Sequence, residues 1–196
     1  MKSLLIILFT MILTENFILV KFLGICPFLG VSKNLKSAMG MSVAVTVVMV
    51  LSSATTYGIQ VGLLEPLGVA YMQTIVFILV IASLVQLLEF SLKKFSPSLH
   101  NKLGVYLPLI TTNCAVMGVT LLNFTNNYTF LEAIFDGLGA GLGFMLAMVI
   151  FSGVRKMLLR CNPPKAFEGL PITLVAASLT SLAFTGFTGI VENIFK

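Results

Sequence analysis

The chain has 196 residues, of which 58% are hydrophobic and only 10% are charged. A soluble domain has about 25% charged residues, so this composition excludes a soluble globular protein. The formal net charge of +5 is explained by lysines and arginines in short loops, and it does not require a nucleic acid as partner.

Six apolar segments are each long enough to cross a bilayer, which takes roughly 20 residues of helix. They cover residues 3–25, 39–60, 71–92, 103–123, 130–153 and 170–192. The first follows Lys2 as the core of a secretory signal would, but no small-x-small cleavage site comes after it, so we expect it to be retained. No hydrophilic stretch could form a soluble domain. We therefore predict one all-α integral membrane domain over residues 1–196.

The basic residues of the loops fall after the first, third and fifth segments. The other two loops, 61–70 and 124–129, contain no lysine or arginine. The positive-inside rule then places the basic loops in the cytoplasm and both termini on the outer side. The basic loop residues are Lys33, Lys36, Lys93, Lys94, Lys102, Arg155, Lys156, Arg160 and Lys165.

One small motif occurs in the first and fourth segments, which are the matching members of two three-helix halves, about 1–97 and 98–196. Cys26 is followed four residues later by Gly30-Val31, and Cys114 by Gly118-Val119. Because three is odd, two halves with the same fold must be inverted relative to each other. Pro27 and the "TTN" before Cys114 favour a break in each helix. We therefore predict inverted repeats whose first and fourth helices are interrupted near the membrane midplane, where the two cysteines face each other.

The two cysteines have a simple alternative explanation, because a free cysteine is a common small residue in apolar interiors. A metal site is the more specific interpretation, but two thiolates complete neither a zinc site nor a [2Fe–2S] cluster, which take four ligands. Cys161 lies in the basic loop "RCNPPK" and does not reach the midplane. A metal centre would therefore need ligands from a second chain.

Two long stretches carry a resemblance to a known family. "NFILVKFLGICPFLGVSKNLKSAMGM" and "LGVYLPLITTNCAVMGVTLLN" resemble the signature regions of the Rnf membrane subunits, in the form typical of the A subunit. That family also includes the D and E subunits of the sodium-pumping NADH:quinone reductase. The similarity extends over nearly the whole chain, including "FILVIASLVQLLE" and the closing "SLAFTGFTGIV".

The resemblance implies a function and a cofactor. Cys26 and Cys114 would be two of the four ligands of an intramembrane [2Fe–2S] cluster, with the others supplied by a homologous sister subunit. Other subunits would carry flavin and iron–sulfur groups. Electron flow between ferredoxin and NAD would drive Na⁺ or H⁺ across the cytoplasmic membrane of a bacterium or archaeon. This chain would be a subunit of that translocase with no catalytic residues of its own.

A secondary transporter or channel without a redox cofactor is the main rival, since inverted repeats and broken helices suit it equally. The helix ends at Gly24 and Asn113 would then bind an ion or substrate. Glu15, Lys21 and Asn113 are further candidates for an ion path or for the surroundings of the cluster, because polar groups in a span are often functional. Glu15 and Lys21 are six residues apart, which is not one helix face, so we do not expect them to pair.

The remaining motifs have simpler interpretations. The run "DGLGAGLG" lies in an apolar span, so Gly137/Gly141 and Gly139/Gly143 indicate close helix packing and not a nucleotide site. The same packing is predicted for "GIQVG", residues 58–62. Asp136 would cap the fifth helix or lie at an interface, and His100 would be a surface residue.

Overall fold

The computed structural model describes residues 2–64, 66, 68, 70–95, 107–161 and 163–186. These residues form helices joined by turns and loops, without a strand among them, which confirms the all-α prediction. The predictions made for His100 and Lys102, and for the part of the sixth apolar segment that follows Gly186, lie outside the described residues.

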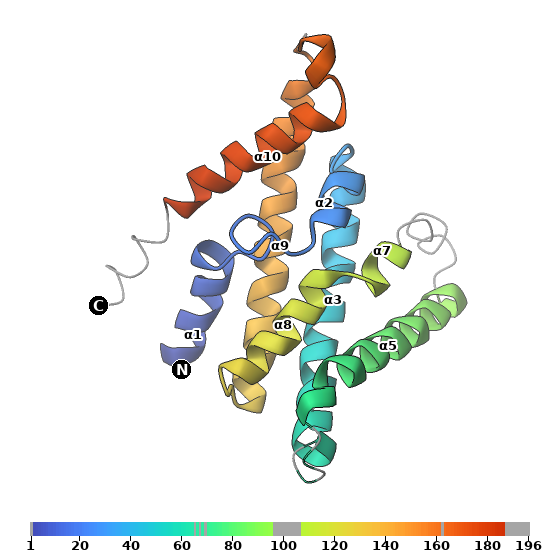
Figure 1. Cartoon of the computed structure of the whole chain (residues 1–196). Coiled ribbons are helices and arrows are strands. Elements are labelled where there is room, and N and C mark those ends of the chain that lie inside the picture. Colours follow the sequence, from blue (N-terminus) through green and yellow to red (C-terminus); the bar gives the residue numbers. More distant parts are fainter. Residues whose placement is uncertain are drawn as a thin grey trace.

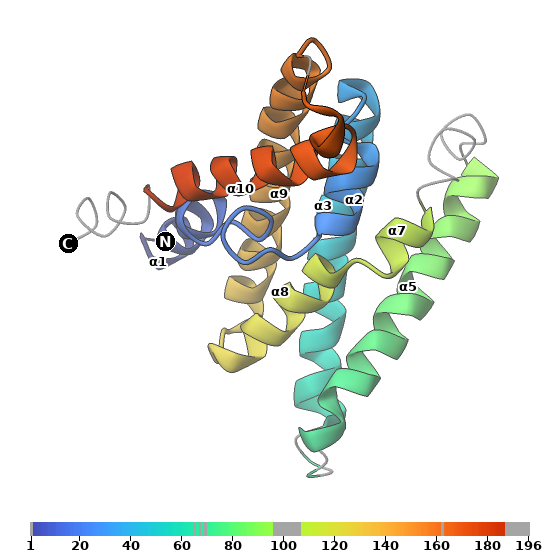
Figure 2. The same cartoon turned by 45° about the horizontal axis from the view of Figure 1, so that its top comes forward.

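Two long helices stand side by side at the centre of the molecule (Figures 1 and 2). They are α3, Leu35–Ile59, which continues as the π-helical turn η2, Gln60–Leu64, and α9, Phe130–Leu158. A third, α5, Gln73–Phe95, follows the short turn η3, Ala70–Met72, and packs against α3 and α8. In the described part of the chain, residues 35–64, 73–91 and 130–158 form helices long and apolar enough to cross a membrane.

The other three apolar segments form shorter helices. The first consists of α1, Lys2–Phe9, with the π turn η1, Thr10–Thr14, and then a non-helical stretch, 15–24, before α2, Ile25–Val31. The fourth is divided into α7, Leu107–Thr111, and α8, Cys114–Thr125. The sixth contains α10, Leu170–Thr185, preceded by the turn η5, Lys165–Phe167. The predicted interruption of the first and fourth helices is confirmed. We call residues 15–24 break 1 and residues 112–113 break 2.

Glycines allow α9 to approach α3 closely. A Cβ atom on Gly137 would lie 2.8 Å from Ser53 Oγ, and one on Gly141 would lie 2.5 Å from the side chain of Thr46. The packing predicted for this pair is therefore confirmed, and α9 and α3 form the central interface of the chain.

The second glycine pair of α9, Gly139 and Gly143, faces α1 and η1. A Cβ atom on Gly139 would lie 3.2 Å from Leu8 O, and one on Gly143 would lie 2.9 Å from Met11 O. These contacts bring α1 and η1 against α9. The corresponding prediction for Gly58 and Gly62 is wrong for the described residues, since nothing lies within 4 Å of a Cβ at either position.

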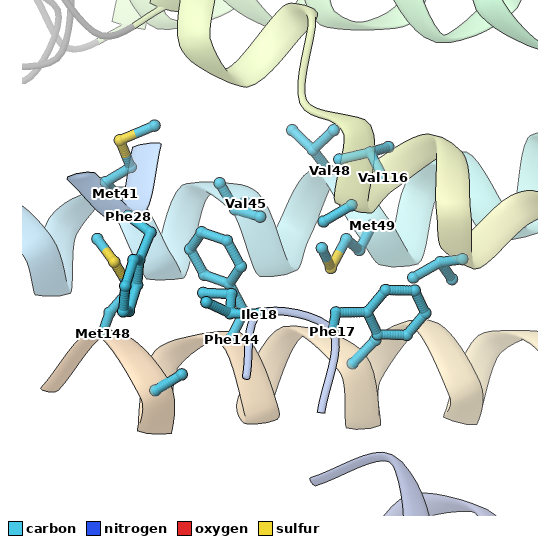
Figure 3. Packing of buried hydrophobic residues seen from close by; sticks show 14 of the residues in the cluster. Phe17, Ile18, Phe28, Met41, Val45, Val48, Met49, Val116, Phe144 and Met148 are labelled. Atoms are coloured by element: carbon cyan, nitrogen blue, oxygen red, sulfur yellow. The ribbon is translucent and has the colours of Figure 1, made fainter. Parts of the chain in front are cut away.

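Aromatic and aliphatic side chains fill the space between α3 and α9 (Figure 3). Break 1 contributes Phe17 and Ile18, which are buried beside Phe144 of α9 and Met49 of α3. Break 1 is thus an internal segment packed into the core. By contrast, α5 exposes large apolar side chains such as Leu87, as expected for a surface that faces lipid or another subunit.

Candidate functional site

Break 1 is held in place by Asn16, which is fully buried. Its Nδ2 donates to the carbonyl oxygens of Gly143 and Ile12, at 2.8 and 3.2 Å. Its Oδ1 accepts from the backbone N–H groups of Ile18 and Leu19, at 3.1 and 3.3 Å. One amide thus satisfies backbone groups that the interrupted helix leaves free, which a membrane interior requires. No local sequence pattern predicted this role of Asn16.

Break 2 is stabilised by a second asparagine. Asn113 has an extended backbone at the start of α8, and its Oδ1 accepts from Ala115 N at 3.1 Å. This is the standard N-cap arrangement, and it starts the helix at Cys114. The expectation that polar residues here bond to backbone groups is confirmed for Asn113.

The two breaks meet through a hydrogen bond to sulfur. The backbone N–H of Gly24 donates to Cys114 Sγ at 2.9 Å. Gly24 has a φ of +85°, and a Cβ atom there would lie 3.1 Å from the ring of Phe144 and 3.2 Å from Ala115. Glycine is therefore favoured at this position both by its backbone conformation and by the lack of space. Because Cys26 follows two residues later, the structure brings the two predicted cysteine segments into contact.

A second pair of contacts between the two segments is reciprocal. A Cβ atom on Gly118 would lie 2.7 Å from Leu23, just before α2, and one on Gly30 would lie 3.8 Å from Leu109, just before break 2. The glycine of each Cys-x-x-x-Gly-Val motif thus packs beside a leucine that precedes the other cysteine. Each glycine therefore lies beside the segment that leads to the other cysteine, more closely at Gly118 than at Gly30.

Both cysteines are free and exposed on the surface of the chain. Cys26 lies in the first turn of α2, and Cys114 is the first residue of α8. Cys114 also lines an apolar groove of about 300 Å³ between α5 and break 2, together with Ile81 and Met117. Neither cysteine is buried in the core of the chain itself. Among the described residues, no three of His, Cys, Asp and Glu are grouped so that they could hold a metal ion.

Glu15 and Lys21 form an ion pair, contrary to the prediction. Lys21 Nζ lies 2.7 Å from Glu15 Oε2. The spacing argument assumed a continuous helix, but residues 15–24 are not helical, so the chain turns back and brings the two side chains together. The side chains of Lys21 and Glu15 are 27% and 43% exposed, and Lys21 also lies 5.9 Å from the ring centroid of Phe17.

Comparison with known proteins places this arrangement in a family. The profile described as "Rnf-Nqr subunit, membrane protein" matches residues 4–191. The chain belongs to the Rnf-Nqr family of membrane subunits. It is 58% identical over 187 residues to the A subunit of the Na⁺-translocating ferredoxin:NAD⁺ oxidoreductase complex of Acetobacterium woodii, covering 95% of this chain and 97% of that protein.

Two other relatives agree with this assignment. The A subunit of the ion-translocating oxidoreductase complex of Syntrophotalea carbinolica is 50% identical over 193 residues, which cover 98% of this chain and all of that protein. The protein of the same description from Aliivibrio salmonicida is 50% identical over 192 residues, with the same coverage of both chains. Similarity to these Rnf-Nqr subunits therefore extends over both breaks and both halves.

This Rnf-Nqr chain also buries a carboxylate that the sequence analysis placed near a helix end. Asp136 is the seventh residue of α9, fully buried, and neither carboxylate oxygen has a hydrogen-bond partner among the described residues. The start of α9 is instead capped by Thr129 and Glu132. Their Thr-x-x-Glu spacing is the sequence pattern of a capping box, so this helix start could have been predicted from the sequence. Burial raises the pKa of the nearby Tyr128 hydroxyl, and the charge of Asp136 raises it further.

Two basic loops of the Rnf-Nqr chain meet at one end of the molecule. Lys33 and Arg155 line the same pocket of about 390 Å³, together with Glu168 and Cys161. Arg155 donates to Ser32 Oγ at 2.7 Å and so ties the end of α9 to the residue after α2. Cys161 thus belongs to this polar end, apart from the Cys26 and Cys114 segments.

Proposed function

We propose that this chain is the A subunit of an ion-translocating ferredoxin:NAD⁺ oxidoreductase complex of the Rnf type, in the cytoplasmic membrane of a bacterium or archaeon. The near-complete coverage of the corresponding subunits of other such complexes supports this assignment. The chain works as one component of that enzyme, and flavin and further iron–sulfur groups belong to its partners.

Within the complex, Cys26 and Cys114 supply two of the four ligands of a [2Fe–2S] cluster, and a homologous sister subunit supplies the other two. The observation that carries this proposal is the hydrogen bond from Gly24 N to Cys114 Sγ, which joins the two cysteine segments. The donor set fits the group, because both thiols are free and exposed on the surface of the chain. When bound, such a cluster accepts and returns one electron, which divides a membrane crossing of roughly 30 Å into shorter steps.

The chain's own residues prepare this half-site. The Gly24 N–H donates to the sulfur of Cys114, and hydrogen bonds of this kind stabilise anionic sulfur and tune the potential of a bound cluster. Cys114 is the first residue of α8, where the helix dipole also favours negative charge. Phe144 and Ala115 pack against Gly24 and fix the distance between the two segments.

The proposed topology has six spans in two inverted three-helix repeats, residues 1–97 and 98–196, with both breaks near the midplane. The Cys-x-x-x-Gly-Val motif at the start of α2 and of α8, each after a break, supports a two-fold relation between the halves. The shared pocket of Lys33 and Arg155 supports one basic, cytoplasmic end and termini on the outer side.

Serine substitution in the intact complex tests the proposal. Cys26→Ser and Cys114→Ser should each remove about two iron atoms per complex together with the [2Fe–2S] absorbance, and should abolish ferredoxin-dependent NAD⁺ reduction. Cys161→Ser, in the polar pocket, is the matched control and should keep both. If the first two variants keep their iron and turnover, the cysteines are not ligands. If no iron is present in the parent complex, the cofactor-free transporter is favoured.

A further inference from the structure

A narrow pocket lies between α3, α5 and α8, apart from the cysteine segments. Its volume is about 20 Å³, and its polar lining comes from Ser53, Thr56, Gln60, Thr120 and Asn123. About 10–15 Å³ of such space holds one water-sized occupant, so a polyatomic ligand is excluded. The partly exposed rings of Tyr57 and Phe124 also line the pocket and connect it to the surface.

Two buried amide oxygens in this pocket lack a donor. Gln60 and Asn123 are 5% and 7% exposed, and neither Gln60 Oε1 nor Asn123 Oδ1 has a hydrogen-bond partner among the described residues. A buried acceptor without a partner is energetically costly, so both atoms favour an occupant that can donate to them or be coordinated by them. Gln60 is also the first residue of the π turn η2, a feature frequent at functional sites.

The two threonine hydroxyl groups that line the pocket already donate their protons to backbone carbonyl oxygens. Thr56 Oγ1 donates to Ser52 O at 2.6 Å, and Thr120 Oγ1 donates to Met117 O at 2.8 Å. Ser53 Oγ accepts from Asn123 Nδ2 at 3.2 Å. The two threonine oxygens can therefore offer lone pairs to an occupant. A water molecule could donate one hydrogen bond to each of the two amide oxygens. A cation could be coordinated by the two amide oxygens and also by the lone pairs of the threonine hydroxyl oxygens.

The absence or presence of charged groups in the lining determines whether a singly or a doubly charged cation fits the pocket better. None of the described residues that line the pocket carries a carboxylate, and a neutral oxygen set compensates a single charge better than a double one. We propose that this pocket binds a small monovalent cation, with Na⁺ as the probe. A role of that ion in transport rests on the proposed function, but its binding does not.

Sodium titration of the purified complex, followed by ²³Na NMR line broadening, tests the site. Gln60→Leu and Asn123→Leu should each weaken Na⁺ binding about tenfold, because each removes one oxygen ligand. Gln73→Leu is the matched control, since Gln73 is another buried amide but its unpartnered atom is the donor Nε2. The control should bind Na⁺ as the parent does.

Two further readouts separate the possible outcomes. Asn123→Asp adds a negative charge and should tighten Na⁺ binding. This variant tests the proposed site even if a leucine variant does not assemble. Equal titrations for the parent and for all the variants would show that the pocket holds water only and would overturn the site. The [2Fe–2S] absorbance should be unchanged throughout. If that absorbance is absent from the parent while the Na⁺ effects persist, the proposed function fails and this site stands.

Discussion

At the scale of single residues, Gly24 links the backbone of break 1 to the sulfur of Cys114, which directly follows break 2. Its φ of +85° suits glycine, and its Cα lies against Phe144, Ala115 and Asn113. The same residue donates the N–H that Cys114 Sγ accepts. The relative position of the two cysteine segments thus depends on one residue without a side chain.

Replacing Gly24 with alanine should therefore separate the segments. We expect Gly24→Ala to cost about 1–3 kcal/mol through its backbone conformation alone, and the added methyl group should also displace Asn113 and Cys114. The measurement is the iron content of the purified complex together with its thermal midpoint. Gly169→Ala is the control, because Gly169 has a φ of +91° but open space around it. Equal iron loss in both variants would show that crowding at Gly24 is unimportant.

The sequence identified the site residues better than it identified their partners. Cys26, Cys114 and Asn113 could be selected because the repeated motif and the polar "TTN" are local patterns. Asn16 bonds to Gly143, which is 127 positions away, and no local pattern reveals such a partner. The spacing rule failed for Glu15 and Lys21 because it holds only inside a helix.

At the scale of elements, the contact between α3 and α9 depends on small residues, because lipid provides little hydrophobic drive for helices to associate. Gly141→Ala should lower the stability by about 1–3 kcal/mol, since the new Cβ would lie 2.5 Å from Thr46. The thermal midpoint of the complex reports this change. On the same helix, Gly153 has nothing within 4 Å, so Gly153→Ala should not destabilise. Adding Thr46→Ala to Gly141→Ala should restore much of the lost stability. If the thermal midpoint of the double variant does not recover, the Gly141–Thr46 contact is not the cause of the destabilisation.

Hydropathy predicted where the apolar segments lie but not where helices stop. Residues 35–64, 73–91 and 130–158 form the three long helices close to the predicted ranges. Break 1 escapes a hydropathy scan because Phe17, Ile18 and Leu19 are as apolar as a span while they pack into the core without helical structure. The interruption was inferred from Pro27 and the Asn113 region, whose chemistry disfavours continuous helix.

At the scale of the whole molecule, the distribution of basic residues predicts the orientation in the membrane. A membrane-impermeant maleimide should label Cys161 only in inverted vesicles, because its loop carries Arg160 and Lys165. In contrast, Asn126→Cys, in the exposed loop between α8 and α9, should be labelled in intact cells. Cys161→Ser identifies the signal of the native cysteine. The reverse pattern would place the basic loops outside.

The central claim is that the helix after each break supplies one thiolate to a centre completed by a partner. It is tested most directly by purifying this chain and its sister subunit without the rest of the complex, and by measuring iron and the low-temperature EPR spectrum of the reduced pair. We predict about two iron atoms per pair with a [2Fe–2S] signal, both lost with Cys114→Ser. An iron-free pair, or a signal unchanged by Cys114→Ser, would contradict the account.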